Sequence, residues 1–250
     1  MVTGNEEVLE TMVKRKKASM GIAALLGGVF LAGSLQAAPV IYFGEDTDGS
    51  LTNAQAAEAQ FLSNLTGVTV EDFEGLTAGD TFPINISFGT TTATLSGTSN
   101  ISSTGIANTG IAGRFAVSGT QYLNLGTSDA NSFTLTFDTP QAAFGFYGTD
   151  IGDFSGQLTI SLDGGPAIDI PHTVNAPNGS DLYFGLIDVA NPFTTIQFSS
   201  GVLSDAFGFD DFTIGTREQV VDNDVSAPGS LAVLGASLLG LGLTRRRRKN

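Results

Sequence analysis

The 250-residue chain has no cysteine, no tryptophan and only one histidine, His172. The absence of cysteine excludes disulfide bonds and thiol chemistry. The absence of tryptophan argues against a sugar site built on stacked indole rings. No nucleophile-elbow motif accompanies His172, so a Ser-His-Asp hydrolase has little support. We therefore expect no enzymatic activity, and a two-carboxylate glycosidase is the alternative because acidic residues are plentiful.

Basic residues are scarce between the two ends of the chain. Of the 11 lysines and arginines, four stand at positions 14–17 and five at 245–249, which leaves Arg114 and Arg217. Three of the 25 acidic residues precede the first cluster, so the region between the clusters has a formal charge of about −20. We expect no nucleic-acid partner, because this negative charge repels the phosphate backbone. Either bound divalent cations and high salt accommodate this charge, or it serves solubility alone.

The first 37 residues have the three parts of a signal peptide. The basic cluster at 14–17 precedes an apolar run at 20–35, and cleavage after Ala37 keeps the following proline away from the scissile bond. We therefore predict export, with the export machinery and signal peptidase as partners. The acidic segment 1–11 is unusual before such a cluster, so the start codon is either Met1 or, as we hypothesise, Met12.

The other end of the chain has the pattern of a short membrane anchor. An apolar run of about 14 residues, shorter than the roughly 17–25 of a typical span, lies between a helix-breaking tripeptide and a basic end. We predict a transmembrane helix within 227–250 with its basic end in the cytoplasm; the alternative is a flexible tail. The residues that carry this pattern are Ala227, Pro228, Gly229, Arg245, Arg246, Arg247 and Arg248.

This arrangement of tripeptide, apolar helix and arginine-rich end resembles a PEP-CTERM sorting signal. The sequence has Ala-Pro-Gly at 227–229 where the family has Pro-Glu-Pro. The resemblance implies an exosortase-type sorting enzyme as a partner. It also implies a protein that is anchored in the membrane or released to the cell surface after tail processing.

Between the two ends, the sequence predicts an all-β domain at 38–217 and an acidic linker at 218–226. An alanine-rich segment at 53–65, opened by Asn53 as its N-cap, predicts the one short helix. Alternating apolar and polar residues predict a strand after residue 40 and about ten more downstream. We therefore expect a two-sheet antiparallel sandwich, jelly-roll-like. The later predicted strands are 68–73, 84–88, 91–96, 120–125, 132–137, 141–147, 157–162, 166–170, 182–187, 193–199 and 206–214.

The last predicted strand contains a break in its alternation. Phe207 and Phe209 share one parity, whereas Phe212 and Ile214 share the other, and the change falls at Asp210-Asp211. A regular strand cannot bury all four apolar side chains on one face, so the pattern predicts a β-bulge there.

Carboxylates in the first and last parts of the domain form one candidate site. An early acidic strand, with Glu74 at its end, and Asp210-Asp211 in the last strand together resemble calcium-stabilised carbohydrate-binding modules and MAM-like domains. That resemblance implies Ca²⁺ between Glu74 and Asp211, with Asp210 as the substitute ligand, although Ca²⁺ needs six to eight oxygens. The alternative is a solvated or hydrogen-bonded pair.

A second candidate site is the loop that follows the strand at 141–147. It carries Asp150 and Asp153, which we assign to ligand binding together with Arg114. The alternatives are turn chemistry for the two aspartates and a structural ion pair for Arg114. The loop Asp46–Ser50 resembles a calcium loop but lacks the Gly and Glu of an EF-hand at their positions, and we interpret it as a turn.

These patterns together predict an exported, surface- or matrix-associated β-sandwich that binds or organises extracellular polysaccharide. A purely structural or adhesive surface protein is the alternative. Because it rests partly on a fold-level analogy, the functional expectation is a hypothesis.

Overall fold

A computed structural model describes residues 38–97, 104–126, 132–154, 157–200 and 205–221. The predicted signal peptide and the predicted sorting residues, from Ala227 to Arg248, lie outside the described residues. In the part of the chain that is described, no helix is both long and apolar enough to cross a bilayer.

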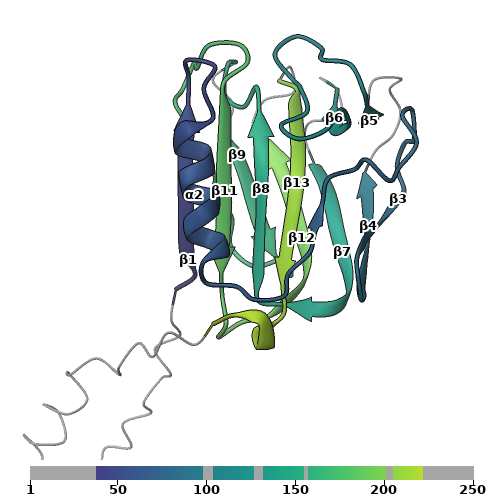
Figure 1. Cartoon of the computed structure of the whole chain (residues 1–250), viewed down its shortest axis with the longest axis vertical. Helices are drawn as coiled ribbons and strands as arrows, with labels where there is room; N and C mark the ends of the chain where they lie inside the picture. The colour runs from purple at the N-terminus through teal and green to yellow at the C-terminus, as the bar shows by residue number, and fades with distance from the viewer. Residues whose placement is uncertain (1–37, 98–103, 127–131, 155–156, 201–204, 222–250) are drawn as a thin grey trace, which may run out of the picture. The chain divides into compact units, whose positions relative to one another are not determined.

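Two antiparallel sheets pack face to face, as Figure 1 shows, and confirm the predicted sandwich. One sheet has the order β1-β11-β8-β13-β6-β5, with β2 beside β13, and the other has the order β10-β9-β12-β7-β4-β3. The strands are β1 (Val40–Asp46), β2 (Val70–Glu71), β3 (Ile84–Phe88), β4 (Thr91–Gly97), β5 (Gly105–Ala107), β6 (Tyr122–Leu125), β7 (Ser132–Gln141), β8 (Ala143–Thr149), β9 (Leu158–Leu162), β10 (Ile168–Asp169), β11 (Asp181–Ile187), β12 (Phe193–Ser200) and β13 (Phe207–Gly215).

Phenylalanine dominates the core between the sheets. Phe133 and Phe198, from neighbouring strands, stack with ring centroids 4.2 Å apart and an interplanar angle of 11°. Phe209 meets both rings edge-on from the facing sheet, with centroids 5.4 Å away. Offset and edge-on rings add to the stabilisation that comes from burying their area. This aromatic core lets a domain without disulfide bonds hold two sheets together.

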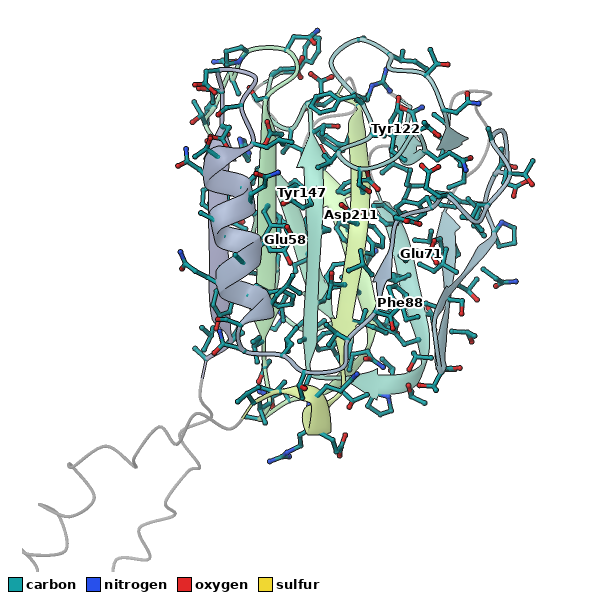
Figure 2. The ribbon with its side chains drawn as sticks, in the orientation of Figure 1. Glu58, Glu71, Phe88, Tyr122, Tyr147 and Asp211 are labelled. Atoms are coloured by element: carbon teal, nitrogen blue, oxygen red, sulfur yellow. The ribbon has the colours of Figure 1, made fainter. Side chains whose placement is uncertain are left out.

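The helix α2 (Thr52–Leu62) packs on the outer face of the first sheet, over β1 and β11 (Figure 1). Phe61 reaches across to Gly145 and Gly185, where an added Cβ would lie 2.9 Å and 2.7 Å from its ring. The Tyr147 hydroxyl of β8 donates a hydrogen bond of 2.7 Å to Glu58 of the helix. Figure 2 shows these two side chains between α2 and the sheet.

The helix begins differently from the prediction. Asn53 is the second helical residue and not the N-cap, so that prediction was wrong. The carboxylate of Asp46, at the end of β1, accepts the backbone N–H groups of Asn53 at 2.8 Å and Ala54 at 3.0 Å. A carboxylate from the preceding strand therefore satisfies the free helix donors and also suits the positive end of the helix dipole.

The predicted bulge in the last strand is confirmed. The β13–β8 register shifts between Asp210 and Thr213, and Asp211 has a φ of +49°. This extra residue keeps Phe207 and Phe209 on the core side together with Phe212 and Ile214. It also leaves the carboxylates of Asp210 and Asp211 free to contact a loop.

The first sheet has one end rich in loops and one end where the chain enters and leaves. Asp46, Asp181 and Thr149 lie side by side at the first end, and Val40, Ile187 and Ala143 at the other. We call the first the loop end; the β1–α2, β5–β6, β8–β9 and β10–β11 loops meet there. After β13 the chain forms a 3₁₀ turn, Arg217–Gln219, at the opposite end.

Candidate functional site

Hydrogen bonds between backbone segments hold the loops of the loop end together. The N–H of Asp150 donates to Ser180 O at 2.9 Å, and the N–H of Asn175 donates to Gly152 O at 2.9 Å. Glu45 of β1 accepts the N–H and hydroxyl of Thr173 at 2.9 Å and 2.7 Å. The loop end is thus a single surface built from segments that are far apart in sequence.

The predicted ligand residues Asp150, Asp153 and Arg114 are brought together here. Asp150 is buried with a φ of +62°, and its Oδ1 accepts the Gly179 N–H at 3.2 Å. The pKa of Asp150 is raised to about 6, chiefly by burial; the Gly179 N–H opposes this rise, the Asp153 charge adds to it, and Arg114 opposes it. The three residues thus lie close together, and their role in ligand binding stays a prediction.

The guanidinium group of Arg114 donates its hydrogen bonds to other residues of the domain. Its Nε donates to Ile111 O at 3.1 Å, and its Nη1 donates to Asn124 Oδ1 at 2.8 Å and Leu125 O at 3.2 Å. The side chain is buried. These contacts favour the structural alternative for Arg114, in which the guanidinium fixes the β5–β6 loop beside Asp150.

Asp205 is a member of the site that the sequence reasoning missed. It is fully buried, and its Oδ1 accepts the Ala206 N–H at 2.9 Å. Its Oδ2 and Asp153 Oδ1 are both buried without a donor among the described residues. Burial first, and then the adjacent Asp153, raises the pKa of Asp205 to about 7. A protonated Asp205 would supply the donor that the buried Asp153 oxygen lacks.

Three loops of the loop end each carry one exposed apolar side chain. Ile111 is 43% exposed, Phe154 58% and Val174 60%, and they come from the β5–β6, β8–β9 and β10–β11 loops respectively. Phe154 follows Asp153 directly in the chain. The loop end therefore carries an exposed aromatic ring in the same loop as Asp150 and Asp153.

His172 lies in the same region but forms no triad. Its Nδ1 is 3.3 Å from Thr173 O, and its Nε2 is buried without a partner among the described residues. An added Cβ at Gly152 would lie 2.3 Å from its Nδ1, so the ring packs tightly on the β8–β9 loop. This placement matches the interpretation of His172 as a loop residue.

The predicted metal residues Glu74, Asp210 and Asp211 lie elsewhere, around the segment 117–121. Asp210 Oδ2 accepts the N–H groups of Val117 at 2.7 Å and Ser118 at 3.0 Å. The Ser118 hydroxyl donates to Asp211 at 2.7 Å. We call Glu74, Asp210 and Asp211 the carboxylate clamp, because together they hold this segment on β13.

Glu74 completes the clamp from the other side of the segment. Its Oε1 accepts the N–H groups of Thr120, at 2.6 Å, and Gln121, and these two bonds hold the pKa of Glu74 below its usual value. Burial raises the pKa of Asp210 to about 7 despite its backbone donors. The clamp oxygens thus already have protein donors, and a cation would have to displace them.

Within the described residues, no group of three or more His, Cys, Asp or Glu side chains is arranged to hold a metal ion. The calcium site predicted at Glu74, Asp210 and Asp211 stays a prediction.

A cavity of about 350 Å³ lies at the end opposite the loop end, and it is lined by apolar residues that include Pro39, Pro192 and Phe193. Its two carboxylates have donors: Thr194 and Thr195 donate to Asp163, and Asn191 donates to Asp188. We assign it no function.

No protein-family model and no curated protein matches the chain. Among solved structures, TmCBM61 in complex with beta-1,4-galactotriose is similar, with 15% identity over 58% of this chain and 94% of that one and a TM-score of 0.28. A carbohydrate binding module of family 29 has 11% sequence identity, with 64% of this chain and 96% of that chain covered and a TM-score of 0.28. An exo-beta-1,3-galactanase from Phanerochaete chrysosporium has 17% sequence identity, with 52% of this chain and 30% of that chain covered and a TM-score of 0.29. TM-scores this low do not establish a shared fold.

Proposed function

We propose that the chain is an exported, surface-tethered β-sandwich of jelly-roll type that binds neutral extracellular polysaccharide at its loop end. The exposed Phe154, one residue after Asp153 in the β8–β9 loop, is the observation that carries the proposal. A sugar ring packs its C–H face on an aromatic ring while its hydroxyl groups donate to carboxylate and carbonyl oxygens. Phe154 supplies the platform that tryptophan supplies in other proteins.

Charge and topology narrow this proposal. The formal charge of about −20 between the two basic clusters repels uronic acids and sulfated sugars, so a neutral polymer is favoured. The ends of the described domain lie opposite the loop end (Figure 1), so a tether at either terminus leaves the loop end facing outward. The signal peptide and the sorting tail predicted from the sequence supply the export and the tether.

A glycan array with Ca²⁺ present, followed by calorimetry on the best neutral oligosaccharide, tests the proposal. Phe154→Ala should weaken binding about 10-fold, which corresponds to the loss of one aromatic contact of about 1.4 kcal/mol. The melting temperature should be unchanged because the ring is 58% exposed. Phe43→Ala, which removes a 36% exposed ring on β1, is the matched control and should bind normally.

Failure of the wild-type protein to bind any glycan on the array would instead support the structural or adhesive alternative. A carboxylate hydrolase is the second candidate, because Asp205, whose pKa burial raises to about 7, is a potential general acid beside Asp153. Release of reducing ends from a bound polysaccharide, abolished in Asp205→Asn, would favour the hydrolase.

A further inference from the structure

Two buried carboxylates face each other at the loop end, on the helix side of the first sheet. Asp46 of β1 and Asp181 of β11 are directly paired in the antiparallel register. Directly opposite side chains share a face, with Cβ atoms roughly 4.5–5.5 Å apart. Asp46 is 4% exposed and Asp181 is 2% exposed. Two like charges opposite each other in a buried setting destabilise a sheet unless something compensates them.

The two carboxylates differ in their hydrogen-bond donors. Asp46 accepts four: the N–H groups of Asn53 and Ala54 at 2.8 Å and 3.0 Å, the Ser50 hydroxyl at 3.0 Å and the Asn53 amide at 2.9 Å. Asp181 has none, because both of its oxygens are buried without a partner among the described residues. The other buried aspartates described, 150, 188, 205 and 210, each accept at least one backbone N–H.

The surroundings of Asp181 contain no protein cation that offsets its charge. After burial, the groups that raise its pKa, to about 7, are Asp46, Asp48 and Glu45. The two basic residues of the domain lie elsewhere, since Arg114 donates to Asn124 and Leu125. Arg217 belongs to the 3₁₀ turn at the opposite end. A buried polar group without a partner requires an explanation, such as an ion.

The adjacent loop is rich in oxygen ligands. Asp48 is exposed, and its carboxylate accepts one N–H, from Ser50 at 3.0 Å. Asp48 and Asp46 are among the charges that act on Asp181, so these carboxylates lie near one another. All of these side chains offer oxygen and none offers nitrogen or sulfur. Hard cations prefer such sets, and Ca²⁺ accepts irregular geometry with six to eight oxygens, some of them from water.

We propose that Asp181 and the Asp46–Ser50 loop form a Ca²⁺ site that joins β1, β11 and the start of α2. Asp181 and Asp48 are its carboxylate ligands, backbone carbonyls and water supply the remaining oxygens, and Asp46 holds the loop through its four hydrogen bonds. The site is separate from the carboxylate clamp and does not depend on the proposed sugar binding.

Calorimetry and thermal melting of the full-length chain test this site with CaCl₂ alone, after EDTA treatment and dialysis. At about 100-fold excess over the dissociation constant, Ca²⁺ should raise the melting temperature by roughly 5–10 °C. KCl at matched ionic strength should not reproduce the shift. Asp181→Asn should abolish the response. Asp188→Asn, at the other end of β11 with its carboxylate already satisfied by Asn191, should retain it.

Each outcome decides the proposal. A wild-type protein that shows neither heat nor a shift with Ca²⁺ overturns it, because Asp181 would then be a protonated or hydrated carboxyl group. A response that survives in Asp181→Asn places calcium elsewhere and overturns it as well. If Asp181→Asn does not fold, the exposed Asp48→Asn replaces it, and its Ca²⁺ affinity should fall at least about 10-fold with the fold intact.

Discussion

Asp210 of the carboxylate clamp and Asp181 are both buried aspartates, but they differ in the number of hydrogen-bond donors that reach them. Asp210 and Asp181 are both buried on the helix side of the first sheet, and burial raises the pKa of each to about 7. Asp210 accepts N–H groups from Val117, Ser118 and Asp211, whereas Asp181 accepts none among the described residues. Burial alone therefore does not distinguish a structural carboxylate from a candidate ligand; the count of donors does.

The largest expected loss of stability comes from removing the Asp210 carboxylate of the clamp. Asp210→Ala removes the acceptor of the Val117 and Ser118 N–H groups and should lower the free energy of unfolding by about 2–4 kcal/mol, because each unsatisfied donor costs about 1–3 kcal/mol. Denaturant unfolding measures this. Asp211→Asn, which keeps a residue suited to the positive φ, is the control and should cost about 1 kcal/mol or less. Equal losses in the two variants would contradict the comparison.

The pH dependence of stability without divalent cations should be the next largest effect. Asp150, Asp181, Asp205 and Asp210 have folded pKa values raised to about 6 or 7 from 3.8. In the folded state they therefore hold protons that the unfolded state has lost. Their contribution is fully present below about pH 4 and disappears as the pH rises through 6–7. The melting temperature in EDTA should be roughly 5 °C higher at pH 5 than at pH 8.

Carboxylates with lowered pKa values limit the gain in stability at low pH, and added Ca²⁺ provides a control at high pH. Glu74 and Asp138 have lowered pKa values through hydrogen bonds, so their contribution is lost as the pH falls below about 4. Stability should therefore peak near pH 4. Ca²⁺ should restore part of the loss at pH 8 in the wild-type protein. A melting temperature that rises from pH 5 to pH 8 in EDTA would show that the buried aspartates stay ionised in the fold.

The smallest effect should come from neutralising Asp181. In EDTA at pH 8, Asp181→Asn removes a buried charge opposite Asp46 and should raise the melting temperature by about 2–4 °C, or about 1 kcal/mol. Asp188→Asn should not stabilise, because the Asp188 carboxylate accepts hydrogen bonds from Asn191. A destabilised Asp181→Asn would indicate a donor outside the described residues.

The fold could be predicted where side-chain alternation carried the information. The parity change at Asp210 predicted the bulge, and most predicted strands lie within one or two residues of the observed ones. The strand β5 was missed because Gly105-Ile106-Ala107 is too short to show alternation in a glycine- and serine-rich segment. The predicted strand 68–73 shrinks to Val70–Glu71, since only two residues pair with β13.

The candidate sites were less accessible to sequence reasoning. Asp150 and Asp153 were found because they follow an apolar strand in a glycine-rich loop. Asp181 and Asp205 stand at strand starts and carry no local signal, and which donors reach a carboxylate depends on segments distant in the sequence. Asp46 illustrates this, because it accepts the first N–H groups of a helix seven residues later. The sequence instead suggested Asn53 as the cap of that helix.

The hydrogen bond between Tyr147 and Glu58 has a practical consequence. With no tryptophan in the chain, its ultraviolet emission comes from four tyrosines. A carboxylate that accepts a hydrogen bond from a phenol quenches tyrosine emission, so we expect weak emission from Tyr147 while α2 is docked on the sheet. Detachment of the helix should brighten it. The protein therefore carries a native optical probe that reports the helix separately from the phenylalanine core.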